Sequence, residues 1–187
     1  MADAFDYIIV GAGSAGCILA NRLSEDGKHT VCLLEAGPPD WNPFIHIPAG
    51  FIKTLTTHKV NWLYEAEPSH WTNGRRTPVP RGKTLGGSSS VNGHIYNRGQ
   101  RLDFDTWAQR GNIGWGYADV LPYFKRMETW HGPEASDRRG DAGPVHVTRG
   151  ARENPLYHAF VEAGRQAGYE VPDDYTGRQQ EGIGACE

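Results

Sequence analysis

The first 37 residues hold the pattern that most restricts the fold of this chain. An apolar run at 5–10 is rich in β-forming residues and is typical of a buried parallel strand. Three glycines follow in the spacing G-x-G-x-x-G, then an amphipathic stretch, then a second apolar run at 30–34 that ends in Glu35. This order of strand, glycine turn, helix, strand and acid predicts a nucleotide-binding α/β fold with a central parallel sheet.

Each glycine of the motif has a physical role. Gly11 permits a tight turn, Gly13 lets backbone N–H groups approach a pyrophosphate, and Gly16 brings helix and strand close together. The phosphates are then expected at a helix N-terminus, where unpaired N–H groups and the helix dipole favour negative charge. Glu35 stands where an acid accepts hydrogen bonds from an adenosine ribose, and its charge disfavours NADP. The motif alone does not separate FAD from NAD.

A second glycine-rich stretch runs from Pro80 to Gly99 and reads PRGKTLGGSSSVNGHIYNRG. Its glycine pair, three serines and Asn92 predict a flexible turn with many hydroxyl and N–H groups. Ser88 is predicted to be the N-cap of a short helix. The start of that helix can hold a second portion of a long anionic cofactor. A polar surface loop is the alternative interpretation of the same residues.

Together, the two stretches resemble the glucose–methanol–choline (GMC) flavin oxidoreductases, above all the bacterial alcohol dehydrogenase and choline dehydrogenase-like branch. The resemblance spans nearly the whole chain and implies a Rossmann-like FAD-binding domain. Some members attach the flavin covalently through a histidine just before the asparagine of this motif. Val91 occupies that position here, so noncovalent FAD is expected. The implied cofactor-binding residues are Gly11, Gly13, Ser14, Ala15, Gly16, Glu35, Ala36, Arg81, Leu85, Gly86, Gly87, Ser88, Val91, Asn92, Gly93 and Ile95.

We expect residues 1–140 to form the FAD-binding domain and residues 141–187 to begin a substrate domain that is incomplete here. An extended excursion is expected at 41–79. The remaining pattern predicts at most one short helix near 49–55, a strand at 62–64 and a turn at Asn73-Gly74. It then predicts helices over 103–111 and 116–130, with a linker-like loop at 131–143. A strand at 145–147 without a partner in this sequence and a helix over 154–168 follow.

Composition and spacing exclude several classes of protein. The net charge of −3 gives no basic surface for nucleic acid. The eight histidines and three cysteines show no metal-ligand spacing, so no metal site is predicted. No apolar run reaches 18 residues, and the N-terminus lacks a basic region before its apolar run. We expect a cytoplasmic protein, either free or peripheral to the inner membrane.

The resemblance implies an enzyme that oxidises an alcohol, a CH–OH donor, by hydride transfer to flavin N5, with this chain as its N-terminal part. Oxygen, a quinone or a dye-like compound would accept the electrons. No residue here is a convincing base, and the catalytic residues are expected beyond Glu187, in a longer chain or a second chain. The alternatives are a non-catalytic flavin-binding fragment or subunit that needs a partner chain, and an NAD-dependent dehydrogenase.

Overall fold

The computed structural model describes residues 4–132, 136–177 and 179–187. The chain divides into two compact units, Met1–His94 and Ile95–Glu187, which are described separately here. This division does not follow the boundary that the sequence suggested at residue 140. The assignment of 1–140 to cofactor binding and of 141–187 to a substrate domain stays a prediction.

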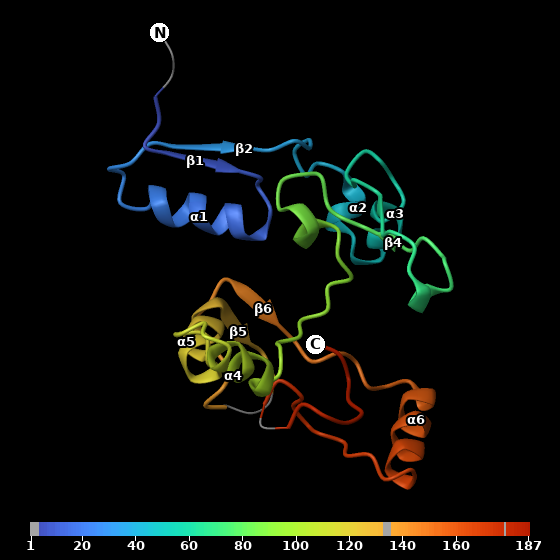
Figure 1. The fold of residues 1–187 in the computed structure, drawn as a ribbon. Helices are drawn as coiled ribbons and strands as arrows, with labels where there is room; N and C mark the ends of the chain where they lie inside the picture. The colour runs from blue at the N-terminus through green and yellow to red at the C-terminus, as the bar shows by residue number, and fades with distance from the viewer. Residues whose placement is uncertain (1–3, 133–135, 178) are drawn as a thin grey trace. The chain divides into compact units, whose positions relative to one another are not determined.

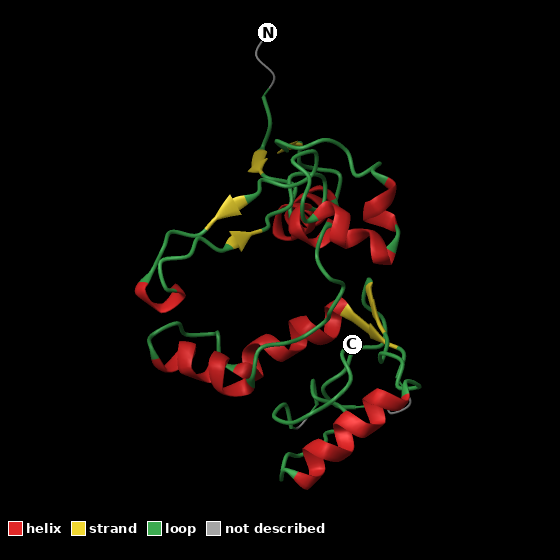
Figure 2. Cartoon of the chain, turned by 90° about the vertical axis from the view of Figure 1, so that its right-hand side faces the viewer, coloured by secondary structure: helices red, strands yellow, loops and turns green. Residues whose placement is uncertain are grey.

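The first unit contains short elements joined by long loops, as the blue to green part of Figure 1 and the loops of Figure 2 show. In chain order they are β1 (Tyr7–Val10), α1 (Ser14–Ser24), β2 (Val31–Leu34), α2 (Pro43–His46), the 3-10 turn η1 (Pro48–Gly50), α3 (Phe51–Thr54), β3 (Tyr64–Glu65), η2 (His70–Thr72), β4 (Pro78–Val79) and η3 (Gly87–Ser90).

The predicted βαβ unit is confirmed. Strands β1 and β2 are parallel neighbours, in register from Tyr7 opposite Val31 to Val10 opposite Leu34. Helix α1 connects them and covers one face of the two-stranded sheet (Figure 1). The end of each strand therefore lies beside the start of α1, the arrangement that a nucleotide site at this edge requires.

The expectation that β1 is buried is wrong for the described residues. Successive side chains of a strand point to opposite faces, and α1 covers only one face. Ile9 is half-buried, whereas Ile8 is 62% exposed and Val10 is 83% exposed on the uncovered face. The apolar run therefore predicted the strand correctly but not its burial.

The excursion at 41–79 holds more short helices than the single one expected near 49–55. Helix α2 was missed because four residues give no periodicity, yet its cap is clear: Asn42 Oδ1 accepts a hydrogen bond of 3.0 Å from Phe44 N. The Asn73-Gly74 turn is confirmed by φ angles of 51° and 72°. It lies inside the longer connection between β3 and β4, which pair antiparallel.

The second unit begins with two helices, α4 (Arg101–Gln109) and α5 (Tyr117–Met127), which were expected from the sequence. They pack against each other through Phe104, whose ring lies 5.6 Å from the ring of Phe124 and 6.3 Å from that of Tyr117. Helix α5 therefore covers the apolar face of α4.

Strands β5 (Glu128–Trp130) and β6 (Val145–Val147) form a parallel pair. The expectation that the strand at 145–147 has no partner in this sequence is wrong, because residues 128–130 do not continue the preceding helix but form β5 beside it. The connection between them was expected to be a linker. Residues 133–135 lie outside the described residues, but Arg139 and Gly140 are buried, so this part is packed structure.

A buried ionic network explains that packing. Glu128 is fully buried and its Oε2 accepts hydrogen bonds from Arg98 Nη2 at 2.6 Å and Arg139 Nη1 at 3.3 Å. Arg139 also donates to Asp174 and Glu187. Burial alone would lower the pKa of Arg139, but the hydrogen bonds to these two carboxylates outweigh it and hold the pKa above its usual value.

Helix α6 (Pro155–Gln166) agrees with the predicted helix, with Asn154 as its N-cap and Gly168 in the left-handed region at a φ of 85°. Its apolar residues differ widely in exposure. Val161 is 7% exposed, but Leu156 and Phe160 are 77% and 64% exposed, and Ala167 is exposed too. No helix among the described residues is long and apolar enough to span a membrane.

The network yields a stability prediction. Replacing Glu128 by alanine leaves two buried guanidinium groups short of a partner, so we expect Glu128→Ala to lower the free energy of unfolding by about 3–5 kcal/mol. The control is Glu25→Ala, which breaks an exposed pair with Arg22 and should cost less than about 1 kcal/mol. Denaturant unfolding measures both. Equal losses in the two variants would contradict the structural role of Glu128.

Candidate functional site

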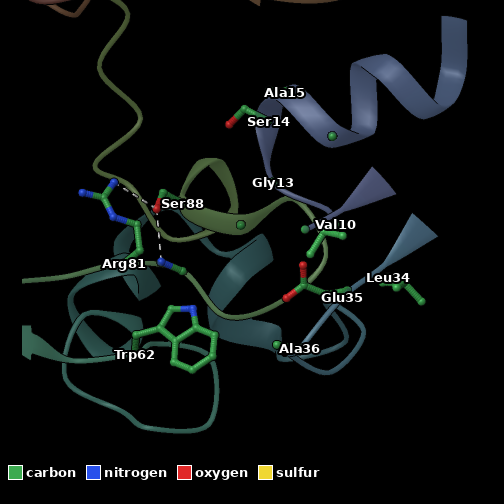
Figure 3. Close-up of a pocket in the computed structure, with 14 residues that line it drawn as sticks. Val10, Gly13, Ser14, Ala15, Leu34, Glu35, Ala36, Trp62, Arg81 and Ser88 are labelled. Atoms are coloured by element: carbon green, nitrogen blue, oxygen red, sulfur yellow. Dashed lines mark hydrogen bonds between the residues drawn. The ribbon is translucent and has the colours of Figure 1, made fainter. Parts of the chain in front are cut away.

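The candidate site is a cavity of about 770 Å³ in the first unit, at the edge where β1 and β2 end. Figure 3 shows its wall running from the start of α1 past Glu35 to Trp62 and Arg81. Helix α1 has no side-chain cap among the described residues, and its N-cap is Gly13. The backbone N–H groups of the first turn are therefore available to a ligand, and the helix dipole favours an anion there.

Two of the motif glycines have distinct roles in this geometry. A Cβ on Gly13 would have nothing within 4 Å, so the missing side chain leaves open space at the helix start. A Cβ on Gly16 would lie 1.9 Å from the carbonyl oxygen of Gly11. Gly16 therefore permits the close approach of helix and turn, whereas Gly13 keeps the cavity free, as the spacing predicted.

The second glycine–serine stretch packs directly on the first. Gly86 N donates a hydrogen bond of 2.7 Å to Ala12 O. A Cβ on Gly87 would lie 2.8 Å from the Cα of Gly13. Gly86 and Gly87 also have φ angles of 83° and 56°, which glycine adopts without strain. The two loops predicted from separate parts of the sequence therefore meet at one site.

Ser88 lies at the cavity, but the expectation that it caps a helix is wrong. It lies inside the 3-10 turn η3, whose N-cap is Gly86. Its Oγ instead accepts hydrogen bonds from Gly82 N at 3.1 Å and from Arg81 Nη1 at 3.5 Å, drawn as dashed lines in Figure 3. Ser88 therefore holds the guanidinium of Arg81 at the cavity wall, where it adds positive charge.

Glu35 is fixed by the backbone around it. Its Oε2 accepts from Ala12 N and its Oε1 from Gly37 N, both at 2.8 Å. Each carboxylate oxygen can accept more than one hydrogen bond. The group therefore retains capacity for the hydroxyl groups of a ribose, and its negative charge disfavours a phosphate at that place.

The cavity brings together ten of the sixteen residues predicted to bind the cofactor: Gly11, Gly13, Ser14, Ala15, Gly16, Glu35, Ala36, Arg81, Gly87 and Ser88. Five others in the first unit do not line it: Leu85, Gly86, Val91, Asn92 and Gly93. Ile95 belongs to the second unit. A role in binding stays a prediction for all sixteen.

Four lining residues were missed by sequence reasoning: Val10, Leu34, Trp62 and Gly82. Val10 and Leu34 are the last residues of β1 and β2, so their position follows from the motif. Trp62 had no such signal, because an isolated aromatic residue more often belongs to a core. Within the described residues no three His, Cys, Asp or Glu side chains cluster as metal ligands, and the three cysteines are free thiols.

Comparison with known proteins agrees with this geometry. A family model described as GMC oxidoreductase matches residues 5–187. An oxygen-dependent choline dehydrogenase of Sinorhizobium fredii is 56% identical over 182 residues, which are 97% of this chain and 33% of that protein. The chain thus spans about a third of the length of the curated relatives that it matches.

Solved structures give the same result. Pyridoxine 4-oxidase from Mesorbium loti is 36% identical with a TM-score of 0.82, covering 91% of this chain and 33% of that one. A formate oxidase of Aspergillus oryzae RIB40, described for modification of its FAD, is 27% identical with a TM-score of 0.83, covering 97% and 33%. The Rossmann-like α/β fold expected from the sequence is thereby confirmed.

The two motif glycines form a matched pair for a test. Gly13→Ala should fold normally, because its Cβ meets no atom, yet it should lose binding of added FAD, since the methyl group enters the cavity. Gly16→Ala forces its Cβ against a backbone oxygen, so we expect it to lower the free energy of unfolding by about 1–3 kcal/mol. Thermal unfolding and FAD titration separate the two effects. Full FAD binding by Gly13→Ala would place the phosphates elsewhere.

Proposed function

This chain belongs to the GMC oxidoreductase family, and from that we propose that it is the FAD-binding part of a larger enzyme that oxidises an alcohol. The observation that carries the proposal is the single cavity formed by both glycine-rich stretches. A Rossmann motif alone accommodates many nucleotides, but here the second loop adds Ser88 and Arg81 to the same wall. A simple NAD-binding domain does not need this second loop, so its presence favours FAD.

The residues present fit FAD. The uncapped start of α1 is placed for the diphosphate, and the open space at Gly13 lets the phosphates approach the backbone. Glu35 is held by two backbone N–H groups in an orientation suited to the adenosine ribose. Arg81, which donates a hydrogen bond to Ser88, supplies a positive charge that offsets the negative charge of the diphosphate.

When bound, the flavin supplies the redox chemistry, because its N5 accepts a hydride from a carbon that bears a hydroxyl group. The residues of this chain bind and orient the cofactor and cover one side of it. We assign no proton-accepting base to them. The base, the rest of the substrate domain and the cover that excludes water are proposed to come from the remainder of the enzyme, in the same chain or in a second one.

Noncovalent attachment of the flavin is part of the proposal. Val91 stands where some family members carry the histidine that bonds to flavin. Its side chain is 3% exposed, packs in a small core with Ile45 and Val60, and does not line the cavity. An aliphatic side chain has no nucleophilic atom, so no bond to flavin can form there.

The proposal extends to the substrate, the electron acceptor and the location of the enzyme. The relatives are named for choline, pyridoxine and formate, which supports a small-molecule donor, and we propose an alcohol. The prefix "oxygen-dependent" in the name of the choline dehydrogenase makes oxygen our first candidate acceptor, before a quinone or a dye. We propose a cytoplasmic location, either free or peripheral to the inner membrane.

The full-length protein that carries these residues tests the proposal. It should be yellow when purified, reduce a redox dye in the presence of a suitable alcohol, and release its flavin into the supernatant when precipitated with acid. A yellow pellet would contradict noncovalent attachment. A flavin-containing protein that oxidises none of a broad panel of alcohols would favour a non-catalytic flavin-binding subunit. Colourless protein that binds NAD would reject FAD.

Glu35 provides a quantitative test of the ribose contact. We expect Glu35→Ala to weaken FAD binding by about 1.5–3 kcal/mol, because hydrogen bonds to a charged acceptor are lost. Glu25→Ala removes an exposed carboxylate at the end of α1 and serves as the control. Titration of flavin fluorescence measures both variants. Unchanged FAD affinity in Glu35→Ala would show that this carboxylate only fixes the backbone of the turn.

A further inference from the structure

His131 and His146 form a close pair on the surface of the second unit. Nε2 of His131 lies 2.8 Å from Nδ1 of His146, and the two ring planes differ by only 13°. Both residues are exposed. They stand 15 positions apart in the chain, a spacing that indicates no ligand motif. The tertiary structure alone therefore brings the two imidazoles together.

Strand pairing places both rings on one face. His146 lies in β6, directly opposite Thr129 of β5. His131 follows the last residue of β5 and continues the pairing, because its backbone N–H donates to Val147 O at 2.9 Å. Side chains alternate along a strand, so His131 points to the same face as Thr129 and therefore as His146.

The backbone beneath the pair is well supported. Val147 is only 3% exposed. Trp130 N donates to Gly140 O at 2.9 Å, and Thr129 Oγ1 donates to Gly143 O at 2.6 Å. Strand β5 is thus held by β6 on one side and by these two glycines on the other. Two ligands on such a frame lose little conformational freedom when they bind an ion.

The charges near the pair favour a cation on this face. Asp141 forms an antiparallel bridge with Thr129, so its carboxylate belongs to the same face as the histidines. The guanidinium groups of Arg139 and Arg149 lie 4.0 and 5.8 Å from the ring centroid of Trp130. The side chain of Trp130 points to the opposite face, and those positive charges lie with it.

The distance between the two nitrogens suits two ligands of one metal ion. Imidazole nitrogens bind such ions at about 2.0–2.1 Å, so two of them at a right angle are about 2.9 Å apart and two in a tetrahedral site about 3.3 Å apart. The observed 2.8 Å matches adjacent positions of a square-planar ion. That geometry is typical of Cu²⁺ and Ni²⁺, and Cu²⁺ binds nitrogen ligands most tightly among the divalent first-row metals.

Metal binding requires only a change of tautomer in the pair. In the free pair one facing nitrogen donates a hydrogen bond to the other, whereas an ion needs both lone pairs. The proton between them can move to the second nitrogen of its own ring, which is Nδ1 in His131 and Nε2 in His146. Each imidazole then stays neutral, and no net proton is released. Both rings are exposed, so they can turn toward a common ion without displacing buried side chains.

We propose that His131 and His146 form a Cu²⁺ site that joins β5 to β6, independent of the flavin chemistry proposed above. No third His, Cys, Asp or Glu completes the ligand set within the described part of the chain. Water therefore fills the remaining positions, and a chelator removes the ion. Because the two ligands are adjacent only in the folded protein, the bound ion stabilises the second unit.

Copper titration of the full-length protein, treated first with a chelator, tests the site. Isothermal titration should show a binding component that is at least about 10-fold weaker in His131→Ala and in His146→Ala, because loss even of a group that only orients a metal ligand costs 10- to 100-fold in affinity. Electron paramagnetic resonance should show coupling of this Cu²⁺ to imidazole nitrogen.

The matched control is His158→Ala, which removes an exposed histidine of α6 and should leave this component unchanged. Copper binding of equal affinity in all four proteins would overturn the site. Loss of the component in only one of the two pair variants, or in His158→Ala as well, would also overturn it.

A second measurement decides the matter if an alanine variant does not fold. His146→Gln keeps a polar side chain but removes the imidazole, and circular dichroism checks its fold. Ni²⁺ is used here because it shares the square-planar geometry and does not oxidise the free thiols of the chain. It should raise the Tm of the unaltered protein and not that of His146→Gln. An equal rise in both proteins, or no rise in either, would contradict a metal link between the strands.

Discussion

The cavity depends on the contact between Gly13 and Gly87, two residues from distant parts of the sequence. A Cβ on Gly87 would lie 2.8 Å from the Cα of Gly13, so the two backbones touch directly. A side chain on Gly87 would hold the second loop away from the start of α1. Ser88 and Arg81 would then move out of the wall, and the phosphate-binding turn would lose its second side.

Further close backbone contacts extend from that pair. A Cβ on Gly82 would lie 2.1 Å from Gly87 O, and one on Gly37 would lie 2.1 Å from Lys83 O. These contacts bring the segment at 81–84 against both the glycine turn and the end of β2. Trp62 follows because it pairs with that segment. Contacts between backbone segments therefore form most of the support of the cavity, and they keep its walls at fixed distances.

The second unit is organised by charge instead. Glu128 lies at the start of β5 and binds guanidinium groups from Arg98 and Arg139, which come from loops before and after it. Arg139 then reaches Asp174 and Glu187 near the end of the chain. A buried charge without such partners would be strongly destabilising. The network therefore holds the loops of this unit together where apolar packing between its elements is sparse.

The sequence by itself determined the parts that depend on local geometry. The run of strand, glycines, helix, strand and Glu35 fixed β1, α1, β2 and the site at their ends, because turn conformation and close approach demand glycine at set positions. The residues of the second glycine–serine stretch also predicted a turn there. Helices α4, α5 and α6 followed from their apolar spacing.

Only the tertiary structure decided which segments meet. It left one face of β1 uncovered, gave β6 its partner β5, and set Ser88 to hold Arg81 instead of capping a helix. It also placed Trp62 at the cavity through pairing with a segment about twenty residues further along. Such contacts join residues whose spacing in the sequence carries no period, so no local pattern records them.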